Sequence, residues 1–252
     1  SKKGLESKPI SSITRLQRTN PFPQLPDSRD HDLLRAIEQT NEESDEDVQV
    51  RTQALKLLSS FKTANAVSAI AQIALYDLSA KLRSDAVSAL AEIDHESVFE
   101  AIVTACADPT REVRAAAARG LFKLTFDRAH AWARIVESED TSRMRHVARC
   151  ASEGDLVARS FDRLTHPDQK IAYEAFALTV LLVRSGEADP IFKALGEHRD
   201  ENVKLALLHV LQSVQEETSY DRLSHVLTHY NLSPNIAAKV NEVRSCLQMS
   251  HA

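Results

Sequence analysis

Apolar residues recur along this chain at helical spacing, and one short pattern returns at a nearly constant interval. The pattern is an aliphatic residue, often followed by Arg or Lys, then two variable positions and one or two small or apolar residues. A fixed period of this length is typical of one supersecondary unit that repeats along the chain. The aliphatic residues, spaced 27 to 33 positions apart and called anchors below, are Val50, Leu82, Val113, Met144, Ile171, Val203 and Ile236.

Each repeat is predicted to contain two helices, one that carries the anchor and one that precedes it. In the third repeat, Val113, Ala116 and Ala117 follow the i, i+3, i+4 spacing of one buried helix face. Pro109 precedes this helix, where a missing N–H costs little, and Asp108 is predicted to cap it. The sequence therefore predicts an all-α fold of fourteen helices in seven antiparallel pairs.

Residues 1–29 differ from the rest of the chain. They contain six Lys and Arg residues against two acidic residues, and four of the eight prolines. We interpret them as a basic, Pro-containing linker or tail that precedes a repeat domain at residues 30–252. Two alternatives stay open, namely a tether beside anionic lipid and a segment that docks on the repeats.

The recurring pattern resembles the short HEAT repeats of the phycobilisome-lyase-like family. In that family, an acidic residue six positions before the repeat Arg contributes to a ladder between neighbouring repeats. The resemblance covers about residues 31–248 and implies an α-solenoid, a HEAT-type superhelix of about seven antiparallel helix pairs. The acid-to-Arg pairs that match are Asp45 with Arg51, Asp77 with Arg83, Asp108 with Arg114, and Glu139 with Arg145. Each Arg can lie over the carboxylate of an adjacent repeat, and because a guanidinium is planar, such a pair would fix the angle between repeats.

Composition narrows the functional classes. The net charge of −5 gives no electrostatic argument for nucleic-acid binding. No run of eighteen apolar residues is present, so no membrane insertion is predicted. Cys106, Cys150 and Cys246 lie far apart without a CxxC pair, which indicates reduced thiols in a cytoplasmic protein. We expect a monomer, associated with a membrane only through a segment upstream of Ser1.

Candidate chemistry is sparse. His225 and His229 would share a helix face, but no third ligand accompanies them, so no metal is predicted. Cys150 has basic neighbours that would favour its thiolate. No ordered acid or base accompanies that thiol, so we predict no catalytic residue and no cofactor.

The face of the anchor helices is the predicted binding surface, because solenoids bind partners on their concave side. In the middle repeats this face carries cations, an imidazole and a phenol. These side chains lie two and six residues after the anchors or close to those positions. The predicted partner-binding residues are Arg119, Lys123, His146, Cys150 and Tyr173. The predicted function is a non-catalytic protein-interaction scaffold or regulatory module, the soluble cytoplasmic part of a larger membrane-anchored protein. The alternative, which the resemblance implies, is a HEAT-type chromophore (phycobilin) lyase.

Overall fold

The computed structural model describes residues 32 and 36 and the ranges 48–95, 97–124 and 131–250. Within these residues the chain forms thirteen α-helices and no strand, which confirms the predicted all-α repeat fold. The chain divides into two compact units, Ser1–Arg128 and Ala129–Ala252, and each is described by itself. The predicted tail and the helix expected before Val48 fall outside the described residues, apart from residues 32 and 36.

The described residues of the first unit form five helices: α2 (Val48–Phe61), α3 (Ala64–Tyr76), α4 (Ala80–Leu90), α5 (Val98–Ala105) and α6 (Arg111–Lys123). The second unit contains eight: α7 (Ala131–Glu137), α8 (Thr141–Glu153), α9 (Leu156–Arg163), α10 (Gln169–Arg184), α11 (Asp189–Glu197), α12 (Glu201–Val214), α13 (Ser219–His229) and α14 (Pro234–Ser250). Each of the seven anchors lies in the first turn of an even-numbered helix. The period in the sequence therefore marks one helix of every hairpin.

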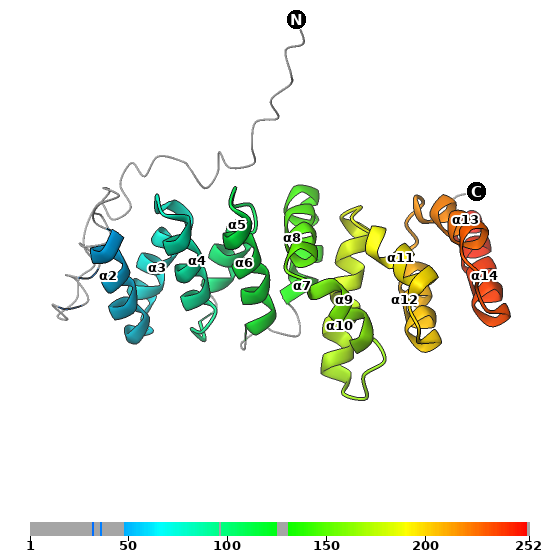
Figure 1. Cartoon of the computed structure of the whole chain (residues 1–252), viewed down its shortest axis with the longest axis horizontal. Helices are drawn as coiled ribbons and strands as arrows, with labels where there is room; N and C mark the ends of the chain where they lie inside the picture. Colours follow the sequence, from blue (N-terminus) through cyan, green and yellow to red (C-terminus); the bar gives the residue numbers. More distant parts are fainter. Residues whose placement is uncertain (1–31, 33–35, 37–47, 96, 125–130, 251–252) are drawn as a thin grey trace, which may run out of the picture. The chain divides into compact units, whose positions relative to one another are not determined.

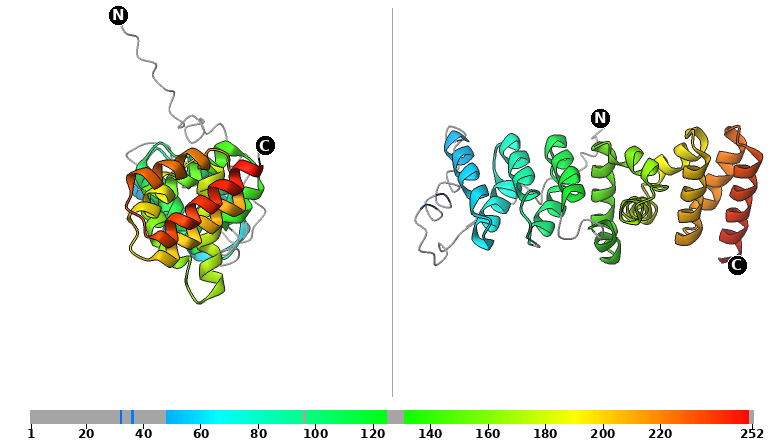
Figure 2. Two further views of the ribbon diagram at one scale, coloured as in Figure 1. Left: turned by 90° about the vertical axis from the view of Figure 1, so that its right-hand side faces the viewer. Right: turned by 90° about the horizontal axis from the view of Figure 1, so that it is seen from below.

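In the first unit the helices form two layers. The even-numbered helices α2, α4 and α6 pack side by side, and α3 packs against α5 behind them (Figure 1, Figure 2). Small residues allow close approach, and a Cβ at Gly120 of α6 would lie only 3.3 Å from the Cβ of Ala91. Burial of Leu82 and Ile70 between the layers supplies the hydrophobic stabilisation that one hairpin lacks.

The second unit keeps the even-numbered layer but departs from regularity near its start. Helices α8, α10, α12 and α14 pack in order, whereas α7 packs against α10, and α9 packs against α8, α10 and α12. Only Gly154 and Asp155 separate α8 from α9, and Asp155 adopts a left-handed backbone conformation with φ 57°. This tight link accounts for the short anchor spacing of 27 residues between Met144 and Ile171.

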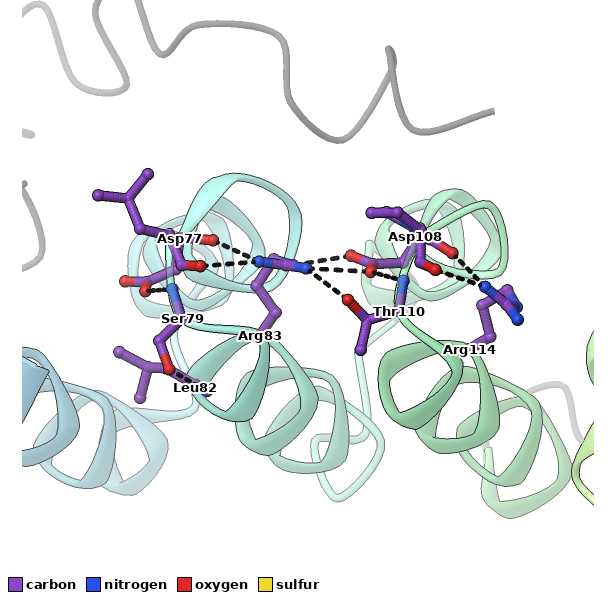
Figure 3. A network of polar contacts seen from close by, with 9 residues as sticks. Asp77, Ser79, Leu82, Arg83, Asp108, Thr110 and Arg114 are labelled. Carbon is purple, nitrogen blue, oxygen red and sulfur yellow. Dashed lines mark hydrogen bonds and ion pairs between the residues drawn. The ribbon is translucent and has the colours of Figure 1, made fainter. Parts of the chain in front are cut away.

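Two buried Arg–Asp pairs join successive hairpins of the first unit, and Figure 3 shows the second of them, between Arg83 and Asp108. Arg51 donates from Nε and Nη2 to the carboxylate of Asp77, at 2.7 and 3.1 Å. Arg83 donates in the same way to Asp108, at 2.8 and 3.1 Å. All four side chains are at most 6% exposed, so these pairs are shielded from solvent and from salt.

The six-residue spacing between Asp and Arg in the sequence corresponds to a hydrogen bond with the main chain and not to an ion pair. Nη1 of Arg83 donates to the main-chain carbonyl of Asp77 at 2.8 Å, and Nη1 of Arg114 donates to that of Asp108 at 2.9 Å. Each Asp carboxylate therefore binds the Arg of the preceding repeat, while its carbonyl binds the Arg of its own repeat.

The N-cap residue of α6 is Thr110, so the prediction that Asp108 caps this helix is wrong. Its carboxylate instead accepts from the backbone N–H of Thr110 and from Arg83.

The other two predicted ladder pairs differ. Asp45 lies outside the described residues. Glu139 is exposed in a turn with φ 52°, and Arg145 forms an exposed ion pair with Glu187 at 3.9 Å. The expected pairing of Glu139 with Arg145 is absent from the described contacts, because Glu139 lies in this exposed turn and Arg145 on the solvent side of α8.

Candidate functional site

In the first unit, the predicted binding residues Arg119 and Lys123 both lie on α6 and are exposed. Lys123 Nζ lies 3.0 Å from Glu92 Oε1, and both side chains are at least 60% exposed. An ion pair this exposed contributes little to stability. Both cations are therefore accessible to a partner.

In the second unit, His146 on α8 and Tyr173 on α10 occupy the equivalent position, two residues after the anchor. Helices α8 and α10 pack together, so these two side chains belong to one face of the unit. His146 is half-buried, whereas Tyr173 is 40% exposed and is one of the few large apolar side chains that reach solvent. A phenol and an imidazole thus share this surface.

Two arginines extend the same surface along α8. Arg149 Nε lies 2.8 Å from Glu187 Oε1, and Arg145 Nε lies 3.9 Å from that oxygen. The side chains of Arg149 and Arg145 are about half exposed, at 54% and 50%. Glu187 therefore accepts a hydrogen bond from Arg149 and lies beside Arg145, and both cations keep surface that is available to a ligand.

The protonation of His146 follows from its surroundings. Partial burial and then the positive charge of Arg149 lower its pKa below the ordinary value, with a smaller contribution from Arg145; Asp140 acts in the opposite direction. At neutral pH the imidazole is consequently uncharged. It offers a partner one hydrogen-bond donor and one acceptor and adds no charge to the surface.

Cys150 corrects the sequence interpretation. It is fully buried in α8, so its predicted place on a partner-binding surface is wrong. Six residues after the anchor, Arg119 and His209 are exposed, but Cys150 and Ala177 are buried. Helix α8 packs against α7, α9 and α10, and this irregular environment covers a position that is open elsewhere.

The remaining predicted residues separate into two groups. Arg119 and Lys123 belong to the first unit, and His146 and Tyr173 belong to the second. Each unit therefore holds one pair of the predicted binding residues.

A surface groove that the sequence interpretation missed lies between α11 and α13. Its volume is about 750 Å³, and Phe192, Val226 and Tyr230 contribute to its apolar lining. The guanidinium of Arg222 stacks over the Phe192 ring, 4.2 Å from the ring centroid, and forms an ion pair with Asp189. The cation on this wall is thus held in place from two sides.

A second groove runs along the other side of α11. It has a volume of about 430 Å³ and is lined by apolar residues that include Val157, Phe161 and Ala194. Pro190, Lys193 and Glu197 of α11 contribute to both grooves, which therefore flank one helix.

A glycine inside α11 is the one feature of the sequence that points to the region of these grooves. Gly196 is a poor helix former inside α11, and a Cβ at this position would lie 2.3 Å from ring atoms of Tyr230. The glycine therefore allows the Tyr230 ring to pack directly on the helix backbone. Periodicity did not reveal this, because Gly196 lies on α11 and Tyr230 lies just after the end of α13.

His225 and His229, also on α13, stack with ring centroids 3.7 Å apart. Within the described part of the chain, no group of three or more His, Cys, Asp or Glu side chains is arranged to hold a metal ion. Among the helices that the structure describes, none combines the length and apolarity needed to cross a membrane.

The helix hairpins, their period and the buried Arg–Asp pairs define an α-helical repeat protein of the HEAT type. No family model and no curated protein matches the sequence. The complex of CpcE and CpcF of phycocyanin lyase from Nostoc sp. PCC7120 is similar at 17% identity and a TM-score of 0.36, over 91% of this chain and 97% of that chain. An archaeal HEAT-like repeats protein from Thermococcus onnurineus NA1 is similar at 17% identity and a TM-score of 0.33, over 91% of this chain and 100% of that chain. At these scores neither similarity carries weight for function, and the repeat class rests on the helices themselves.

Proposed function

We propose that this chain is a non-catalytic protein-interaction scaffold or regulatory module that binds a protein partner through exposed positions on its even-numbered helices. One observation carries the proposal. On α8 and α10, an exposed Tyr173 shares a surface with half-buried His146 and with Arg145 and Arg149, which lie beside Glu187. Tyr and Arg are the residue types in which binding energy concentrates when a partner excludes water from them.

The exposed cations Arg119 and Lys123 of α6 form a separate proposed contact surface, in the first unit. Since Lys123 has only a solvent-exposed partner in Glu92, a ligand carboxylate can replace that contact at small cost. We therefore expect the partner to present acidic and aromatic groups to these helices. The wide spacing of the three cysteines, without a CxxC pair, supports action in a reducing, cytoplasmic compartment. Attachment to a membrane would come from a part of a longer protein outside this sequence.

The chromophore lyase alternative is less favoured. Its proposed chemistry needs an accessible reactive group, and the thiol that the sequence offered, Cys150, is buried. No other observation on α8 or α10 favours covalent chemistry.

Affinity capture from the source cell, followed by mass spectrometry, tests the proposal. The intact chain is compared with the Arg119→Ala/Tyr173→Ala variant and with a control, Arg159→Ala/Tyr76→Ala. The control is matched because it also removes one cation and one phenol, from the odd-numbered helices α9 and α3, where Arg159 is exposed and Tyr76 is partly exposed. All three proteins must first show the same melting temperature.

We expect the first pair of substitutions to abolish capture of a partner that the control retains. Equal capture by both variants would show that the partner binds elsewhere. Covalently attached pigment on a co-purified protein would favour the lyase alternative.

A further inference from the structure

The two grooves beside α11 have an apolar floor that the proposed function does not use. In the groove toward α13, Phe192 and Val226 are buried at the base, and Pro190 and Tyr230 are partly exposed. In the groove toward α9, Val157 and Phe161 occupy the corresponding place. A short segment with aliphatic side chains would remove this apolar surface from water.

The walls of these grooves carry an excess of negative charge. Four carboxylates, those of Asp155, Asp189, Glu197 and Asp221, line the grooves together with the cations Lys193 and Arg222, which gives a net charge of −2. Lys193 lies 3.8 Å from Glu197, and Arg222 is paired with Asp189. Asp155 and Asp221 have no ion pair among the described residues, and both are exposed. The charge that remains for a ligand is therefore acidic, at one carboxylate on each side of α11.

We infer that the grooves flanking α11 are a docking site for a short basic segment with aliphatic side chains from a partner protein. The aliphatic side chains would enter the apolar floors, and Lys or Arg side chains would reach Asp155 and Asp221. A second copy of the folded unit fits less well, because its described residues carry 17 acidic and 14 basic side chains and would bring like charge to the acidic walls.

The sequence itself contains a segment of the required chemistry, which provides a probe. Residues 8–18, which lie outside the described residues, contain Lys8, Arg15 and Arg18 without an acidic residue, and their aliphatic residues recur at every third position. Three synthetic peptides separate the contributions. One has the sequence of residues 8–18, one has its three basic residues replaced by Glu, and one keeps the charges but has Ile10, Ile13 and Leu16 replaced by Ser.

Binding is measured by fluorescence anisotropy of labelled peptide on the full-length chain. The chain carries Arg15→Glu and Arg18→Glu, so that its own copy of the segment does not compete. We expect saturable binding of the first peptide, weakened several-fold in the other two, and weakened further by added salt. Asp155→Lys with Asp221→Lys should abolish that binding.

A matched control, Glu112→Lys with Glu137→Lys, reverses two exposed carboxylates on α6 and α7 and should leave binding unchanged. Circular dichroism and melting temperature must match across the variants. The inference is overturned if no peptide binds saturably, or if the Ser-substituted peptide binds as tightly as the first. Equal binding by the groove variant and the control variant would also overturn it. None of these outcomes depends on the partner sought by affinity capture.

Discussion

The guanidinium of Arg83 donates to both carboxylate oxygens of Asp108, a residue of the next hairpin that is 1% exposed. The same guanidinium donates to the carbonyl of Asp77, which itself accepts from Arg51 through its carboxylate. Arg51, Asp77, Arg83 and Asp108 thus form one continuous chain of charge-assisted bonds through three hairpins. In a repeat protein, where each unit contacts only its neighbours, this chain fixes the angle between successive units.

Replacing Arg83 with Ala should destabilise the protein strongly. The substitution leaves Asp108 buried without its guanidinium partner, and breaking a buried pair in this way typically costs about 3–5 kcal/mol. Lys81→Ala is the matched control, because Lys81 lies on the same helix and pairs with Asp85 in solvent. It should leave the free energy of unfolding nearly unchanged. Urea unfolding of both variants checks this, and equal midpoints would contradict a structural role for the pair.

The lowered pKa of His146 predicts a pH dependence with a definite sign. In the unfolded chain this histidine binds a proton below about pH 6.5, whereas in the folded chain it does so only at lower pH. The unfolded state therefore binds more protons between the two pKa values. The contribution of this residue to stability decreases as the pH falls below about 6.5, and the loss is complete below the folded pKa.

His146→Gln should therefore lose less stability than the parent between about pH 7.5 and pH 5.5, as measured by urea unfolding at each pH. His209→Gln is the control, since His209 is exposed on α12 and is solvated in both states. If His146→Gln keeps the full pH dependence of the parent, another group is responsible for it.

Gly196→Ala should destabilise the chain, although the same substitution in an unobstructed helix stabilises by about 1 kcal/mol. The new Cβ would lie 2.3 Å from two ring atoms of Tyr230, so the ring must move. We expect a loss of about 1–3 kcal/mol, the range for inserting a group into a packed site. In the Tyr230→Ala background the same change should be neutral or stabilising, and a double-mutant cycle measures this coupling. Additive effects would mean that the Tyr230 ring does not rest on α11.

Thiol labelling should distinguish the three cysteines. Cys106 and Cys150 are buried, whereas Cys246 on α14 is partly exposed with Gln212 Nε2 3.6 Å from its sulfur. In the native protein we expect a disulfide reagent to modify Cys246 first. The other two should react only as fast as the structure opens. Peptide mass spectrometry after timed quenching assigns each site, and early modification of Cys150 would contradict its burial.

The local pattern of the sequence was sufficient to predict the repeat and its helices. A stripe of apolar residues at helical spacing makes an isolated hairpin unstable, because the stripe would be exposed to water. Since the stripe recurs in each repeat, adjacent hairpins must pack together to cover it. For this reason the anchors from Val50 to Ile236 correctly marked every even-numbered helix. The sequence also indicated that Arg51 and Arg83 have a structural role, because each of them directly follows an anchor residue.

Tertiary structure decided which side chains meet and which reach solvent. The carboxylate partner of Arg83 belongs to the next repeat, 25 residues away, and is not the acid six residues before it. Arg119 is exposed and Cys150 is buried at the same position of the repeat, because α7, α9 and α10 surround α8. The grooves beside α11 depend on how closely α9 and α13 approach that helix. Helical periodicity reports the direction of a side chain from its own axis, whereas burial depends on the distance and angle of the neighbouring helices, which arise only when the chain packs.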